Sequence, residues 1–140
     1  MNSYVYTSFP KCYMQTVSGA GSDRIGKHAA YAHFYPNFFI NRYGPWFDTN
    51  TVFPTSEEEC MVRMEWFVEK KYLGDKDYVE KSLKDSELVQ HEDVFLCENV
   101  MKGLKSDAYE AGRYVPLREI PAYHFHVDLH KDLCKGLFSE

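Results

Sequence analysis

Hydrophobic and polar residues along this chain follow two different periods, and the change between them falls near Gly74. Before it, short stretches rich in Tyr, Val, Thr and Phe are typical of β-strands, which we expect at 3–9, 11–17, 29–34, 37–43, 46–53 and 62–68. The last of these alternates most clearly, with apolar Val62, Met64, Trp66 and Val68 on one side. Because the connections are short, the pattern favours antiparallel hairpins.

From Lys76 to Leu104 the apolar residues recur instead at helical spacing. Asp75 is the expected N-cap of this long helix, and Gly103 marks its end. A second helix is expected to begin at Glu119-Ile120-Pro121, since proline is tolerated in a first turn. Strands followed by helices predict an α+β fold, with a sheet covered on one side. At 140 residues the chain is expected to form one domain at most, 1–140.

One side of the long helix contains an unexpected carboxylate. On a helical wheel this side comprises Val79, Leu83, Ser86, Gln90, Asp93, Cys97, Val100 and Leu104. Burying an ionised aspartate without a partner costs several kcal/mol or more, so Asp93 must be neutral, paired or bound to a cation. Two interpretations follow from the pattern: a local aspartate bonded to lysine or to a backbone donor, or a metal ligand.

Two stretches, 35–50 (YPNFFINRYGPWFDTN) and 91–100 (HEDVFLCENV), resemble the catalytic region of the choline monooxygenase family, within the Rieske non-haem iron oxygenases. The resemblance continues in order through Lys102-Gly103-Leu104, Ala108-Tyr109, Gly112-Arg113-Tyr114 and His124-Phe125-His126. It implies a helix-grip fold (Bet v 1/START-like), in which an antiparallel sheet packs on a long C-terminal helix. By this resemblance, residues 1–140 form the C-terminal part of the oxygenase alpha-subunit catalytic domain.

The resemblance also implies two iron cofactors. A mononuclear Fe(II) is held by two histidines and one carboxylate, and the residue here that matches the family's carboxylate is Asp93. The family's two histidines lie on a helix that precedes the matched region, and the ligands of its [2Fe-2S] Rieske cluster lie further upstream. The chain is therefore expected to supply one of three iron ligands, to bind no cluster itself and to need the missing N-terminal portion. No catalytic residue is assigned.

The histidines offer a second candidate metal site. His126 and His130 are four residues apart on the last expected helix, with His124 close by, so they could share a zinc or iron ion. The alternative is that they are surface or packing residues. We expect His33 to be a hydrogen-bonded core residue, and His91 not to be a ligand, because residues two apart on a helix do not face each other.

Aromatic residues crowd one short stretch that contains Tyr35, Phe38, Phe39, Tyr43, Trp46 and Phe47. Most are interpreted as core. A quaternary ammonium group has no N–H to donate, so proteins hold it on aromatic faces, at about 0.5–2 kcal/mol per contact. Tyr43 and Trp46 are the predicted substrate-binding residues, because the Gly44-Pro45 break between them can turn both side chains inward.

Composition limits the other function classes. A net charge of −5 and the lack of a basic run argue against nucleic acid as the main partner. No apolar stretch is long enough for a transmembrane helix, so we expect no membrane partner. The four cysteines lack any Cys-x-x-Cys spacing, which predicts buried, reduced thiols of a soluble intracellular protein and no zinc or iron–sulfur site. For a plant-type member, the resemblance implies the chloroplast stroma, and otherwise the cytoplasm.

The function implied by the resemblance is oxidation of choline toward betaine aldehyde, in glycine betaine biosynthesis. The reaction would use dioxygen and electrons from ferredoxin or a reductase, in a homo-oligomer, and this segment alone is expected to be inactive. One alternative is an oxygenase for another quaternary ammonium, such as carnitine or glycine betaine. Others are a non-enzymatic small-ligand-binding helix-grip module, which the Asp93 carboxylate disfavours, and a truncated product without activity.

Overall fold

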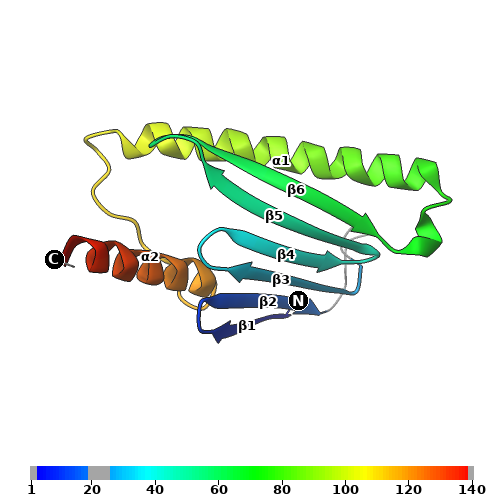
Figure 1. The fold of residues 1–140 in the computed structure, drawn as a ribbon, viewed down its shortest axis with the longest axis horizontal. Helices are drawn as coiled ribbons and strands as arrows, with labels where there is room; N and C mark the ends of the chain where they lie inside the picture. Colours follow the sequence, from blue (N-terminus) through cyan, green and yellow to red (C-terminus); the bar gives the residue numbers. More distant parts are fainter. Residues whose placement is uncertain (1–2, 19–25, 139–140) are drawn as a thin grey trace. The chain divides into compact units, whose positions relative to one another are not determined.

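The computed structural model of this chain describes residues 3–18 and 26–138. Six strands form one antiparallel sheet in chain order (Figure 1): β1 (Ser3–Phe9), β2 (Cys12–Ser18), β3 (His28–Phe34), β4 (Phe38–Tyr43), β5 (Trp46–Pro54) and β6 (Cys60–Val68). The short helix η1 (Lys70–Tyr72) precedes the helices α1 (Lys76–Leu104) and α2 (Ile120–Phe138). The predicted α+β class, the six strands and both helices are confirmed.

The chain divides into two compact units. The first contains residues 1–67 and 114–140, and therefore nearly the whole sheet together with α2. The second contains residues 68–113, with η1 and α1.

The core of the first unit lies on one face of the sheet. Residues paired across an antiparallel ladder share a face, and faces alternate along each strand. Tyr43 pairs with Ala29 on β3 and with Trp46 on β5, while Asp48 pairs with Asn41 two positions further along. All the buried residues described in this unit belong to that face: Tyr13, Ala29, Tyr43, Trp46, Asp48 and Asn50.

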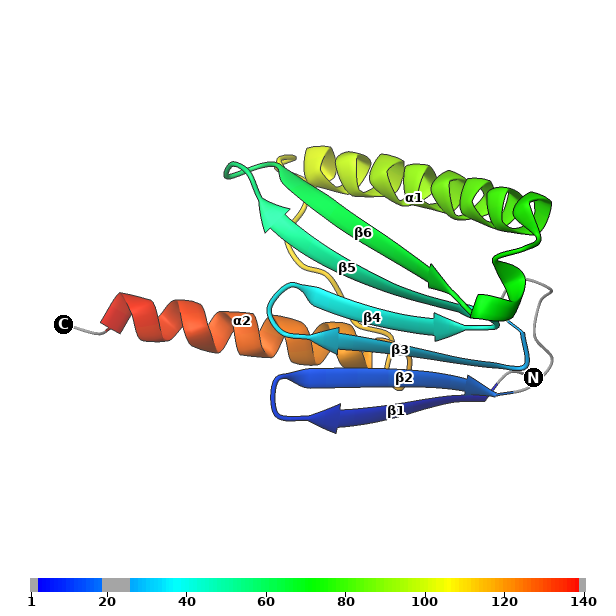
Figure 2. The ribbon, with the colours of Figure 1, turned by 45° about the vertical axis from the view of Figure 1, so that its right-hand side comes forward.

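Helix α2 packs against β1 and β2 within this unit (Figure 2). The imidazole of His124 stacks on the ring of Tyr13, with centroids 5.5 Å apart, and Phe125 lies 5.3 Å from the ring of His33 on β3. Lys11 forms an ion pair with Asp132 at 2.8 Å. At about 100° per residue, positions 124, 125 and 132 fall within about 100° of one another, so one face of the helix makes all of these contacts.

Helix α1 of the second unit begins as the sequence predicts. The Asp75 carboxylate accepts a hydrogen bond of 3.0 Å from the backbone N–H of Tyr78, which satisfies one free donor of the first turn. Lys84 pairs with Glu80 one turn away, at 2.7 Å. Neither helix of the described residues is long and apolar enough to span a membrane.

The predicted burial of one side of α1 is wrong for most of its residues. Ser86 is buried and two others are half-buried, whereas five are exposed: Leu83, Asp93, Cys97, Val100 and Leu104. Leu88 and Phe95, which lie on the opposite side of the helix, are exposed as well. The helical period was correctly identified, but a period does not state what covers a helix.

Candidate functional site

Tyr43 and Trp46 end and begin the two strands of one tight hairpin. They lie directly opposite each other in the β4–β5 ladder and are 8% and 6% exposed. Gly44 adopts a positive φ of 49°, which glycine tolerates without strain, and Arg42 Nη1 donates to the carbonyls of Gly44 and Trp46 at 2.7 and 2.8 Å. The hairpin therefore holds both aromatic side chains on the buried face of the sheet.

A buried carboxylate lies on the same face, next to this aromatic pair. Asp48 is 2% exposed, and its Oδ1 accepts hydrogen bonds from Asn41 Nδ2 at 2.7 Å and Asn50 Nδ2 at 2.8 Å. Asn50, itself 9% exposed, follows Asp48 by two residues on β5. One donor comes from β4 and one from β5, so both strands hold the carboxylate. We call Asn41, Tyr43, Trp46, Asp48 and Asn50 the β4–β5 cluster.

The β4–β5 cluster is electrostatically incomplete. None of the described residues forms an ion pair with Asp48, and two neutral amides do not neutralise a buried negative charge. Trp46 Nε1 and Asn50 Oδ1 are buried without any hydrogen-bond partner among the described residues. Buried polar atoms are nearly always paired, so unpaired atoms beside an unpaired charge are what a ligand site presents.

The sequence pattern pointed to the two aromatic residues of this cluster but not to its polar members. Trp46, Asp48 and Asn50 follow one another at a spacing of two, and the strand indeed buries them alternately. Applying the period of two beyond Trp46 would have placed the carboxylate beside the indole. The partnership with Asn41 depends on the β4–β5 register, which the spacing alone does not state.

Asp93, the predicted iron ligand, lies on α1 with its side chain exposed. Within the described part of the chain, the Asp93 side chain has no hydrogen bond and no ion pair. Neither a lysine nor a backbone donor therefore holds its carboxylate. The described residues contain no group of three or more His, Cys, Asp or Glu side chains that could hold a metal. These residues do not form an iron site among themselves, and Asp93 can contribute only one donor to a site completed by other residues.

The histidines of α2 have partners other than a metal. His126 Nδ1 makes a short hydrogen bond with the Tyr114 hydroxyl, and His130 Nε2 lies 3.6 Å from the thiol of Cys134. No group including them has metal-site geometry within the described residues. In the described structure their contacts are with Tyr114 and Cys134.

His28 and His33, five residues apart, are the remaining histidines that lie close together in the sequence. They lie on a strand, however, where five residues span about 16 Å and odd separations place side chains on opposite faces. His28 contacts Ser18 Oγ at 3.4 Å, whereas His33 contacts the carbonyl of Pro36 at 3.2 Å and stacks on Phe39. Burial lowers the pKa of His33. This pair cannot share an iron, and His33 is the hydrogen-bonded residue that was expected.

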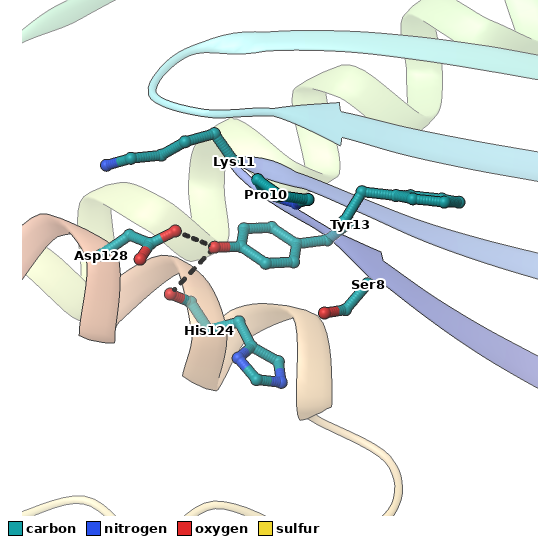
Figure 3. A pocket seen from close by; sticks show the side chains of 7 residues that line it. Ser8, Pro10, Lys11, Tyr13, His124 and Asp128 are labelled. Atoms are coloured by element: carbon teal, nitrogen blue, oxygen red, sulfur yellow. Dashed lines mark hydrogen bonds between the residues drawn. The ribbon is translucent and has the colours of Figure 1, made fainter.

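A surface pocket of about 400 Å³ lies where α2 meets β1 and β2 (Figure 3). The Tyr13 ring reaches between Asp128 and His124, and its hydroxyl donates a short hydrogen bond to the Asp128 carboxylate. Burial, and then this hydrogen bond, raises the pKa of Tyr13 to about 12. Because Tyr13 is paired with Asp128, and Lys11 with Asp132, these polar groups serve to attach α2 to the sheet.

Comparison with known proteins identifies the family of this chain. Residues 4–132 match the family described as ring hydroxylating alpha subunit (catalytic domain). The chain belongs to this family. The predicted membership of the Rieske oxygenase alpha subunits, which are oxidoreductases, is thereby confirmed, and the relatives below confirm the resemblance to choline monooxygenase.

The relatives found are plant enzymes. The chain is 45% identical over 139 residues to the chloroplastic choline monooxygenase of Arabidopsis thaliana. The matched region covers 95% of the chain and 33% of that protein. The identity is 45% over 123 residues with the enzyme of Atriplex hortensis (86% of the chain, 28% of the relative) and 39% over 137 residues with that of Beta vulgaris (94% and 31%). The chain thus spans about a third of the length of these relatives. No solved structure matches it significantly.

Proposed function

We propose that this chain is part of a choline-oxidising Rieske oxygenase, which converts choline toward betaine aldehyde with dioxygen and electrons from ferredoxin. The observation that carries the proposal is its 45% identity to a choline monooxygenase over 95% of its length. The buried pair Tyr43 and Trp46 supports the choice of substrate, since aromatic faces suit a trimethylammonium group. The relatives are named chloroplastic, and we propose the same compartment.

Within that enzyme, the chain's contribution to the metal centre is Asp93. We propose that it is the single carboxylate of a mononuclear Fe(II) site, with the two histidine ligands and the Rieske cluster supplied by other residues of the complete alpha subunit. When bound, the iron supplies dioxygen activation. The exposed position of Asp93 and its lack of a partner in the described chain leave its oxygens available for this.

The substrate-binding role is assigned to the hairpin at Gly44-Pro45. Tyr43 and Trp46 present rings from facing strands, and the arginine bonds that close the turn reduce their freedom before substrate arrives. Pre-ordered side chains lose less entropy on binding, so more of the cation–π energy appears as affinity. A choline ammonium would contact both rings.

The test uses the complete enzyme containing this chain, with choline, dioxygen and reduced ferredoxin. Trp46→Ala or Tyr43→Ala is expected to raise KM for choline several-fold while leaving the iron content unchanged, because each removes one ring from the ammonium. Tyr4→Ala, which removes an exposed tyrosine of β1, is the matched control and should leave KM unchanged. Wild-type KM and kcat in both ring variants would contradict the assignment, and failure of the unaltered enzyme to oxidise choline would refute the proposed function.

A further inference from the structure

We infer that Asp48 is the anionic partner of a bound organic cation, which lies between its carboxylate and the rings of Tyr43 and Trp46. This inference rests on the proposed function in one respect: it names the residue that recognises the charge of the proposed substrate class. All members of the β4–β5 cluster lie within the first unit of the chain.

The negative charge of Asp48 has no counter-charge among the described residues. Asp48 is the most buried residue of the sheet, and no described residue forms an ion pair with it. Removing an ionised carboxylate from water without a counter-charge costs several kcal/mol. The two amides that donate to Oδ1 orient the carboxylate. A carboxylate that is already oriented can bind a partner at a defined position. Asn41 and Asn50 are therefore positioning residues for Asp48.

The groups around Asp48 indicate the kind of cation that would bind there. A carboxylate can only accept hydrogen bonds, so both asparagines turn their NH₂ groups toward it and withhold their carbonyl oxygens. An inorganic divalent cation would require several oxygen ligands around the same point, and this arrangement offers one carboxylate. The neighbouring groups on the same face are instead a phenol and an indole ring. An aromatic pair beside a single carboxylate suits an ammonium without N–H groups.

Two unpaired atoms of the β4–β5 cluster indicate a further property of the ligand. Trp46 Nε1 is a donor and Asn50 Oδ1 an acceptor, and both are buried without a partner in the described chain. A ligand that carries a hydroxyl group near its cationic centre can both accept and donate, so it can pair with either kind of atom. The cluster therefore fits a small hydroxylated organic cation better than a purely apolar ligand.

The test measures binding to the 140-residue chain itself by tryptophan fluorescence. A Trp66→Phe background leaves Trp46 as the single indole, since the sequence has two tryptophans. Choline and tetramethylammonium are titrated at constant ionic strength, together with 3,3-dimethylbutan-1-ol, a neutral isostere of choline. Both cations are expected to bind at least about tenfold more tightly than the isostere, and Asp48→Asn should abolish that preference. Asp85→Asn, at an exposed carboxylate of α1, is the matched control and should retain it.

A purely structural role for Asp48 predicts a different result. If the carboxylate only anchors the two asparagines, Asp48→Asn should lower the melting temperature, and the cations should not protect the unaltered chain. We expect the opposite, because the substitution removes an unpaired buried charge: an unchanged or higher melting temperature, with the protection by tetramethylammonium lost. The comparison of cation with isostere in the unaltered chain needs no variant, and equal binding or no binding there would overturn the inference.

The two proposals fail separately. Asp48-dependent binding of cations by a protein that does not oxidise choline would refute the proposed function and support this inference. Choline oxidation by the complete Asp48→Asn enzyme at wild-type KM would overturn this inference and leave the proposed function standing.

Discussion

Two aspartates of this protein occupy opposite environments, and the environment decides what each can do. Asp48 is nearly inaccessible and is oriented by two amides, so its charge acts over a short distance on whatever lies beside it. Asp93 is exposed on a helix and has no partner among the described residues, so its oxygens are free for a ligand supplied from elsewhere. The first suits recognition of a cation, and the second suits metal ligation.

The role of Asp93 can be tested by removing its charge. In the complete enzyme, Asp93→Asn is expected to reduce mononuclear iron occupancy strongly, since a neutral amide is a much weaker ligand for Fe(II) than a carboxylate. Metal analysis measures the occupancy, corrected for the iron of the cluster. Glu92→Gln is the matched control, because the neighbouring carboxylate points to another side of the same helix. Normal occupancy and activity in Asp93→Asn would remove Asp93 from the site.

At the scale of elements, the hairpin at Gly44-Pro45 and the helix α1 differ in what stabilises them. The hairpin combines ladder pairing, the Arg42 bonds and a buried face. Helix α1 has an N-cap and local ion pairs, but most of its apolar residues are exposed in the described chain. Helices gain most of their stability from packing of an apolar face, so α1 depends more heavily than usual on its local signals.

This dependence predicts a measurable effect of the N-cap. Asp75→Ala should destabilise the start of α1 by about 0.5–2 kcal/mol, because the N–H of Tyr78 loses its acceptor. Amide hydrogen exchange in the first turn of α1 reports the change directly and should speed up there while the sheet is unaffected. Asp77→Ala, in the same turn but without the capping bond, should have the smaller effect. Equal exchange in wild type and Asp75→Ala would show that the cap is unimportant.

At the scale of the whole molecule, the chain spans about a third of its relatives' length, and its described residues form no metal site. We therefore expect residues 1–140, supplied with Fe(II), reduced ferredoxin, dioxygen and choline, to show no sustained formation of betaine aldehyde. A single carboxylate binds Fe(II) weakly, and the cysteines offer no cluster spacing for electron entry. Product analysis and bound-iron measurement test this, with the complete alpha subunit as the positive control. Sustained turnover by the isolated chain would refute the expectation.

The exposed apolar residues of α1 bear on the same question. Leu88, Phe95, Leu96 and Val100 are each more than half exposed. Exposed apolar surface of this extent favours association with another surface. The isolated chain is therefore expected to associate as its concentration rises, which sedimentation would record alongside the activity measurement.

Much of this protein follows from its sequence. The six strands, both helices and the Asp75 cap were predicted because alternation, helical periodicity and capping depend on residues close together in the chain. The family was recognised from stretches that the comparison then matched as one domain over 4–132. Tyr43 and Trp46 were chosen for the turn between them, and their pairing across that turn is a local consequence of a tight hairpin.

The tertiary structure decided the rest. It brings Asn41 to Asp48 through the β4–β5 register, and Asp128 to Tyr13 across a sequence separation of 115 residues. Such partnerships depend on which strands pair and where a helix returns, and no local pattern contains that information. Burial was also decided by the tertiary structure. The helical period places Asp93 on an apolar side of α1, yet its side chain is exposed. Exposure depends on what lies against a helix and not on the sequence of the helix alone.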